Sequence, residues 1–235
     1  MRADGRPVGA AGLGLLAAIH LGIAGGSPAY AQHDRVASTL HNLSASGPGE
    51  VRALNETEVC KFCHIPHSAI LPVPLWGHRL SDAQYATPET SKGKGDYEAA
   101  PQPDGSSRLC LSCHDGTVAL GDIGGSPAPI AMAGSQRLGS DRRGHLGTDL
   151  TGSHPISFVV REDAPAQHAS DRDMGLNNLA VILADEDVRL DEHGKMQCTT
   201  CHDVHADRYF QEGRVPHFWV KPTVEEVCLT CHVLR

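Results

Sequence analysis

Hydrophobic residues recur with a helical period in one long stretch of the chain, residues 177–190, where apolar positions three and four apart predict an amphipathic helix. Two other stretches, residues 71–103 and 121–153, are rich in proline, glycine or serine and lack a period, which predicts long loops. Between these stretches we expect only short regular pieces. The pattern therefore predicts a mostly irregular, loop-rich fold with a few short α-helices.

The N-terminus has the pattern of a secretory signal peptide. Arg2 and Arg6 precede an apolar run over residues 10–23, and an Ala-x-Ala site ends at Ala31. The run is shorter than the about 20 residues that span a membrane, which argues against the alternative of a membrane anchor. We expect a signal peptide at residues 1–31, cleaved after Ala31, and export of the rest to the periplasm or the extracellular space.

Residues 32–235 are expected to form one domain without a membrane span, since no second apolar segment is long enough to cross a bilayer. The whole chain has a formal net charge of −8, and loss of the signal peptide would remove two arginines and one aspartate. An acidic surface does not favour nucleic acid or anionic membranes as partners. Aromatic residues make up only 4% of the chain, so something other than aromatic side chains has to fill the core.

The sequence Cys-x-x-Cys-His occurs four times in the chain. It is the attachment signature of c-type haem, in which two thiols form thioethers to one haem and the histidine binds the iron as its proximal ligand. Four haems would supply the apolar bulk that the core lacks and would give the long loops something to wrap. The motifs contain all eight cysteines, Cys60, Cys63, Cys110, Cys113, Cys198, Cys201, Cys228 and Cys231, and end in His64, His114, His202 and His232.

Paired Cys-x-x-Cys motifs have two other common uses, structural zinc sites and redox-active disulfides. Neither use explains the histidine that follows each motif. Histidine fills about one position in sixteen of this chain, so four occurrences by chance have odds of roughly one in 60,000. We therefore predict four covalently bound c-type haems, with zinc and disulfides as the alternatives.

The face of each iron opposite the proximal histidine can be filled by a second histidine, by methionine or by nothing. Eleven histidines remain beside the four proximal ones, whereas the chain has only four methionines. His67 and His205 each lie three residues after a proximal histidine, on the same side of a helical turn. Two imidazoles placed in this way cannot bind opposite faces of one iron. We therefore expect His67 and His205 to be distal ligands of other haems.

Two distal positions remain. We assign them to His154, which precedes a proline, and to His41, near the start of the expected mature chain. For all four predicted distal ligands, the alternative is an ordinary polar histidine at the surface or in a loop. The other residues considered for these positions are His145, His33, His217 and Met132.

Six segments resemble the multihaem cytochromes c of metal-reducing bacteria that carry doubled motifs, in which a second histidine follows Cys-x-x-Cys-His. Within that group the chain is most similar to the tetrahaem members that polymerise into extracellular filaments. The likeness spans about residues 38–235, and its haem motifs are far more specific for cytochrome c than for filament formation. The segments are HNLSASGPG (41–49), VCKFCHIPH (59–67), PLW (74–76), LCLSCHDGT (109–117), LGTDL (146–150) and HPI (154–156).

The resemblance implies two histidine ligands for every haem, four closely stacked haems at the centre of the fold, and one distal histidine supplied by the next subunit. It gives the proximal role to the four motif histidines and the distal role to His41, His67, His154 and His205. The chain departs from the resemblance at His78, where we expect a residue that binds no iron. It departs again at residues 216–219, which offer an alternative ligand or an interface.

These features predict an electron-transfer protein and not an enzyme. Iron with two histidine ligands has no vacant position for a substrate and can only accept and pass on electrons. The expected partners are other redox proteins that act as donor and acceptor. The alternative is a multihaem reductase, or a subunit that feeds electrons to one. Such reductases often carry Cys-x-x-Cys-Lys, and this chain has no such motif.

Assembly as a monomeric shuttle or as a head-to-tail homopolymer stays open. His41 lies ten residues beyond the expected cleavage site, and the last motif ends three residues before the C-terminus. An N-terminal arm that binds the end haem of a neighbour would join subunits head to tail, and such contacts propagate into filaments unless they close into a ring. The sequence therefore favours His41 as the linking ligand of a filament.

Overall fold

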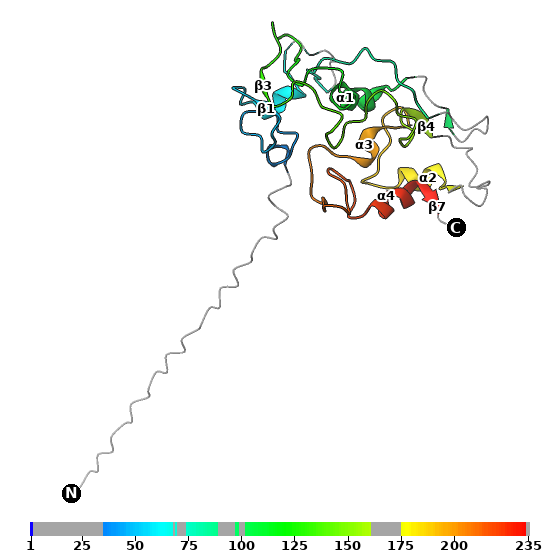
Figure 1. The fold of residues 1–235 in the computed structure, drawn as a ribbon. Coiled ribbons are helices and arrows are strands. Elements are labelled where there is room, and N and C mark those ends of the chain that lie inside the picture. The colour runs from blue at the N-terminus through cyan, green and yellow to red at the C-terminus, as the bar shows by residue number, and fades with distance from the viewer. Residues whose placement is uncertain are drawn as a thin grey trace.

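The computed structural model in Figure 1 describes residues 1, 35–67, 69, 74–88, 97–98, 102–160 and 175–233. Apart from Met1, the expected signal peptide, its cleavage site and His33 lie outside these residues. Within the described residues, short helices and short strands are connected by loops. The loop-rich fold class that the hydrophobic pattern predicts is therefore confirmed.

The helices are short, and four of them coincide with a Cys-x-x-Cys motif. Two are 3-10 helices, η2 (Val36–Ser38) and η3 (Val59–Phe62). The α-helices are α1 (Gly105–His114), α2 (Leu179–Leu183), α3 (Cys198–Cys201) and α4 (Val224–Cys231). None of the helices in the described part of the chain is long and apolar enough to cross a membrane.

Strands of two or three residues join distant segments in antiparallel pairs. β1 pairs with β3, β4 lies between β2 and β6, and β5 pairs with β7. The strands are β1 (Arg52–Ala53), β2 (Tyr97–Glu98), β3 (Met132–Ala133), β4 (Phe158–Val160), β5 (Gly175–Leu176), β6 (Lys195–Met196) and β7 (His232–Val233). In Figure 1, the β1–β3 pair lies at one end of the fold and α4 with β7 at the other, with α1 and α3 between them.

The helix predicted for residues 177–190 forms only over α2. The side chain of Asn178 caps its N-terminus by accepting a backbone hydrogen bond of 2.9 Å. The helix ends at Leu183, and soon afterwards Asp185 Oδ1 accepts the backbone N–H of Val188 (2.9 Å), a local bond that competes with helix formation. Val188 is nevertheless buried. The hydrophobic pattern therefore predicted the buried position correctly, while the predicted helix length was wrong.

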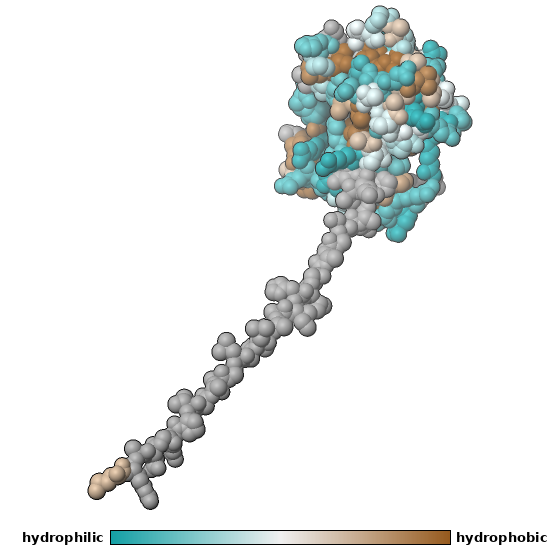
Figure 2. All heavy atoms as spheres, turned by 90° about the vertical axis from the view of Figure 1, so that its left-hand side faces the viewer, coloured by the Kyte–Doolittle hydropathy of each residue, from teal (hydrophilic) through white to brown (hydrophobic). Residues whose placement is uncertain are grey.

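Buried apolar side chains form two small clusters among the described residues. Several large apolar side chains stay exposed, such as Leu183 at 61% and Leu40 at 59%. In the view of Figure 2, hydrophobic patches alternate with hydrophilic residues. Exposed apolar surface of this kind is a common mark of a ligand or partner site. The clusters consist of Ala53, Phe62, Leu120 and Met132, and of Tyr85, Leu111 and Leu150.

Candidate haem-binding sites

Each Cys-x-x-Cys-His motif begins on a helical turn. The turn brings the two thiols of a motif to one side of the helix. At the third and fourth motifs the backbone then becomes extended, with φ −125° and ψ 127° at His202 and φ −107° and ψ 142° at His232. The imidazole thus leaves the helix while the cysteines stay on it. All eight cysteines are described, and none of them forms a disulfide.

Three of the four proximal imidazoles are held through Nδ1 by a backbone carbonyl. A carbonyl oxygen only accepts hydrogen bonds, so Nδ1 carries the proton and Nε2 keeps its lone pair. This tautomer is the one that binds a metal through Nε2, and the bond to Nδ1 fixes the ring and raises its basicity. The bonds run from His64 to Pro74 O (2.8 Å), from His114 to Gly144 O (2.7 Å) and from His202 to His217 O (3.1 Å).

Three of the four predicted distal histidines lie opposite a proximal histidine. In no case do the two partners come from the same Cys-x-x-Cys-His motif or from its immediate neighbourhood in sequence. The pairs are His64 with His205 at a ring-centre distance of 6.2 Å, His114 with His41 at 5.8 Å, and His232 with His154 at 6.2 Å.

These distances match the spacing of two imidazoles that bind one iron from opposite faces. A metal–imidazole bond is about 2 Å long, and the ring centre lies about 1.1 Å behind the bonding nitrogen, so the two ring centres are roughly 6 Å apart. Direct stacking or hydrogen bonding would bring the rings closer together. The pairs also differ in orientation, because the ring planes are 18° apart for His64 and His205 but 66° apart for His114 and His41.

The two extra histidines of the doubled motifs have different surroundings. His205 lies beside His64 of the first motif. His154 also meets a proximal histidine, His232, and its Nδ1 donates to the carbonyl of Pro155 (2.8 Å). His67, by contrast, is exposed and makes no ring contact within the described part of the chain. The structure therefore places three of the four predicted distal histidines beside a proximal histidine.

His41 lies inside its own chain. Its ring stacks on Phe218 with a ring-centre distance of 4.5 Å and contacts His114 edge-on. Burial, followed by repulsion from His114, lowers the pKa of His41 to about 4, so this imidazole is neutral at pH 7 and its lone pair is available to a metal. Within the described chain His41 therefore lies beside His114, whereas the sequence favoured it as a link to a neighbouring subunit.

Two further histidines are engaged in other contacts. Nδ1 of His217 donates to the buried carboxylate of Asp207 (2.7 Å), and its ring stacks on Phe210 at 3.5 Å. His78 is fully buried, with Nδ1 2.9 Å from the carbonyl of Arg79 and Nε2 3.1 Å from another backbone carbonyl. Neither nitrogen of His78 is left for a metal, which fits the expectation that this residue binds no iron.

The remaining alternative ligands also have structural roles. Met132 is buried in the cluster around Phe62, where its side chain fills the core. His145 packs over Gly116, where an added Cβ would lie 2.6 Å from His145 Nε2 and where φ is +73°. Only glycine fits at that position, because the backbone is left-handed and the imidazole occupies the space of a side chain.

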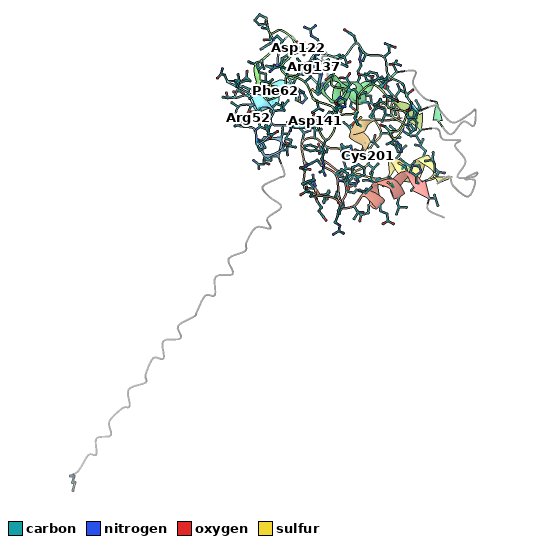
Figure 3. The ribbon with its side chains drawn as sticks, in the orientation of Figure 1. Arg52, Phe62, Asp122, Arg137, Asp141 and Cys201 are labelled. Atoms are coloured by element: carbon teal, nitrogen blue, oxygen red, sulfur yellow. The ribbon has the colours of Figure 1, made fainter. Side chains whose placement is uncertain are left out.

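The motifs lie next to one another in the order of the sequence. A hydrogen bond with Cys110 lowers the pKa of Cys198 to about 7, and the backbone N–H of Cys198 donates to Ser107 Oγ (3.0 Å), so α1 packs against α3. Burial, followed by repulsion from the cysteines of α4, raises the pKa of Cys201 to about 12. Figure 3 places Cys201 at α3, on the side that faces α2 and α4. Burial, followed by repulsion from Cys63, raises the pKa of Cys113, so the first motif lies next to the second.

The third motif borders a cleft of about 360 Å³, a size within the range of cofactor pockets. Its lining includes His202, His205 and Trp219. Charges of both signs also line it, Arg189 and Arg208 together with Glu186, Asp187 and Asp203. Among the described residues, no group of three or more histidine, cysteine or acidic side chains is arranged to hold a metal ion.

Sequence reasoning missed the two tryptophans of the chain as site residues. Trp76 contacts the ring of His64 and Trp219 the ring of His202, both edge-on. The indole nitrogen of Trp76 is buried without an acceptor among the described residues, and a carboxylate of a bound haem would provide one. The cysteines and histidines of the motifs, together with this unpaired indole N–H, fit a haem group.

No protein-family model matches the chain, and no curated protein matches it.

Proposed function

We propose that the chain is an electron-transfer protein with four covalently bound c-type haems, each held by a proximal and a distal histidine. The observation that carries the proposal is the set of three histidine pairs with ring-centre distances of 5.8 to 6.2 Å. Each pair joins a motif histidine to a histidine from another part of the chain. The four motifs supply the thiols that would attach the group.

The residues have separate tasks in this proposal. The cysteines anchor each group covalently, and the Nδ1 bonds keep the proximal imidazoles neutral and oriented. The distal imidazoles close the opposite face against water and small ligands. When bound, the haems would supply reversible one-electron chemistry. The chain itself neither makes nor breaks a bond of a substrate.

His67 and His202 remain once three pairs are assigned. His205 belongs to the third motif and lies opposite His64 of the first, so a reciprocal exchange would place His67 of the first motif opposite His202 of the third. His67 is exposed and would have to turn toward His202. We include this pair as the fourth of the proposal.

One observation favours the alternative, a multihaem reductase or a subunit that feeds one. Within the described residues, the ring partner of His202 is Trp219 rather than a histidine, and a cleft lies beside it. An open iron position there would admit a small ligand. Carbon monoxide distinguishes the two functions: the electron-transfer proposal expects poor binding to the reduced protein, and rapid binding to one haem in four would support the reductase.

The proposal includes the expected route and partners. Residues 1–31 would direct export, and the mature chain would exchange electrons with other redox proteins in the periplasm or outside the cell. A head-to-tail homopolymer is a separate hypothesis, in which His41 would have to leave His114 or another residue would have to form the link. Electron microscopy of the haem-loaded protein tests it, since filaments at high concentration support the polymer and single particles support a monomeric shuttle.

A redox titration tests the function itself. We expect the visible spectrum of the purified protein to change reversibly between oxidised and reduced low-spin haem, with four electrons taken up per chain. Methionine-free ligation predicts midpoint potentials below those of cytochromes c with a Met ligand. A protein that takes up no electrons, or that carries no covalent haem, would contradict the proposal.

A further inference from the structure

The segments that follow the first and third motifs close in the same way. In each, a tryptophan pairs with the proximal histidine as an isolated antiparallel bridge, and the residue before the tryptophan has a left-handed backbone. We call residues 63–77 the first clasp and residues 201–220 the second clasp. The bridges are His64–Trp76 and His202–Trp219, preceded by Leu75 (φ 63°) and Phe218 (φ 61°).

The backbone bonds of the two clasps correspond one to one. In each clasp the residue after the histidine donates to the left-handed residue, and the residue after the tryptophan donates to the second motif cysteine. Nδ1 of the histidine bonds the carbonyl two residues before the tryptophan. The backbone bonds are Ile65–Leu75 (3.0 Å) and Gly77–Cys63 (2.8 Å) in the first clasp, and Asp203–Phe218 (2.8 Å) and Val220–Cys201 (3.1 Å) in the second.

This correspondence does not follow from equal loop lengths. The tryptophan comes 12 residues after the histidine in the first clasp and 17 residues after it in the second. Trp76 and Trp219 are also the two tryptophans of the whole chain, and both stand in this position. A non-glycine residue with positive φ is strained, and such strain persists only where the surroundings enforce it, often at functional sites. The shared geometry therefore points to a shared task.

The task is visible in the ring contacts. The indole of Trp76 stands edge-on to His64 at 6.0 Å and 89°, and that of Trp219 to His202 at 5.0 Å and 78°. Each imidazole is thus held at Nδ1 by a carbonyl and at its side by an indole. The second motif lacks this arrangement, because the aromatic partner of His114 is His41.

We propose that Trp76 and Trp219 are positioning residues that fix the ring planes of the first and third proximal histidines relative to the iron. This inference rests on the proposed function. The plane of an axial imidazole sets the splitting of the iron d orbitals, so the indole acts on the electronic state of one haem without touching its iron.

The test replaces the indole and reads the haem spectroscopically. In the haem-loaded full chain we compare Trp76→Leu and Trp219→Leu with Trp76→Phe, which keeps a ring that can stand edge-on. The matched control is Tyr209→Leu, which removes an aromatic ring near the third motif whose contact is with Arg208. Each variant is measured by intact mass, by electron paramagnetic resonance (EPR) and by potentiometric titration.

We expect each leucine variant to keep four haems and to shift one low-spin EPR signal, because the imidazole plane at that haem is no longer fixed by the indole. Trp76→Phe should restore most of the wild-type signal, and Tyr209→Leu should change nothing. Unchanged spectra in both leucine variants would overturn the proposal. Loss of a haem or a new high-spin centre would also overturn it, because the indole would then be needed for ligation itself.

A second variant pair keeps the test decisive if a leucine variant does not fold. Leu75→Gly should leave the EPR signals unchanged, because glycine adopts the left-handed conformation freely, whereas Leu75→Val should shift the signal of the first haem. Identical signals in these two variants would overturn the proposal. Wild-type protein without covalent haem would instead contradict the proposed function, so the two failures are distinguishable.

Discussion

The imidazole of His205 lies 6.2 Å from that of His64, with ring planes only 18° apart, although the two residues are far apart in sequence. His205 follows the third motif, and His64 ends the first. The pair therefore ties the two doubled motifs together through a space that fits one iron. Its geometry yields the first prediction.

Replacing His205 by alanine is expected to disturb the haem attached at the first motif and not the haem attached beside the mutation. The thioethers do not depend on the distal ligand, so all four haems should remain while one becomes high-spin. EPR of the oxidised protein measures this change. His193→Ala is the matched control, because His193 is exposed and its neighbour is Glu192. A disturbed haem at the third motif would contradict the assignment.

His41→Ala is expected to open the haem at the second motif of the same chain, because His41 pairs with His114 internally. The number of haems and the assembly state should not change. Carbon monoxide binding to the reduced variant measures the open position, and electron microscopy measures assembly. A variant that loses filaments while its second haem stays low-spin would place His41 in a neighbouring subunit instead.

The ring planes predict two classes of EPR signal. His64 and His205 are nearly parallel at 18°, whereas the planes of His114 and His41 are 66° apart and those of His232 and His154 are 69° apart. Parallel axial imidazoles give rhombic low-spin signals, and perpendicular ones give strongly axial signals with a large gmax. We expect both classes in oxidised wild-type protein at liquid-helium temperature. A single rhombic class for all four haems would contradict these planes.

Asp185 is expected to stabilise the fourth motif at neutral pH. Burial raises its pKa, but hydrogen bonds, first from Lys221 (2.6 Å) and also from Thr230 of α4 (3.0 Å), outweigh burial and bring the pKa to about 2. A carboxyl with a depressed folded-state pKa stabilises the fold above its unfolded value and loses this effect as pH falls, here between about pH 4 and pH 2.

Asp185→Asn should therefore lower the free energy of unfolding at pH 7 by about 1 kcal/mol, because solvent screens part of the interaction. Urea unfolding of the haem-loaded protein at pH 7 and at pH 2 measures the difference, which should shrink at the lower pH. Asp187→Asn is the control, since the side chain of Asp187 is exposed. An equal loss in both variants, or a loss that does not depend on pH, would contradict this role.

The sequence predicted those features that depend on local spacing. Helix geometry places the two thiols of a motif on one turn. It also implies that a second histidine three residues later cannot bind the same iron, and His205 does lie beside the histidine of another motif. That His205 meets His64 rather than another motif histidine depends on tertiary packing. No periodic pattern in the sequence indicates which motif histidine lies beside His205.

The structure differs from the sequence-based picture at two places, the helix over residues 177–190 and the segment around His41. The helix over residues 177–190 stops at Leu183, because Asp185 offers local bonds that a hydrophobic period does not detect. His41 was expected on a free arm, yet Asn42 is buried and donates to the carbonyl of Ala37 (2.8 Å), which folds this segment back onto its own chain. Local hydrogen bonds of polar side chains therefore determine both where the helix ends and where the segment around His41 lies.

The clasps were not predictable for another reason. The loops between histidine and tryptophan differ in length, and the strained residues before the tryptophans, Leu75 and Phe218, carry none of the usual signs of a left-handed backbone. Glycine or asparagine would have marked such positions in the sequence. Tertiary contacts enforce the conformation instead, and only the structure reveals that it occurs twice.

The intact mass of the purified, denatured protein tests the central claim most directly. Thioether bonds survive unfolding, whereas coordinated metal ions are lost, so covalent haem is distinguished from zinc and from disulfides. We expect the mass of the polypeptide from Gln32 onward plus four haems. The mass of the polypeptide alone, or of the polypeptide with fewer than four haems, would contradict the account.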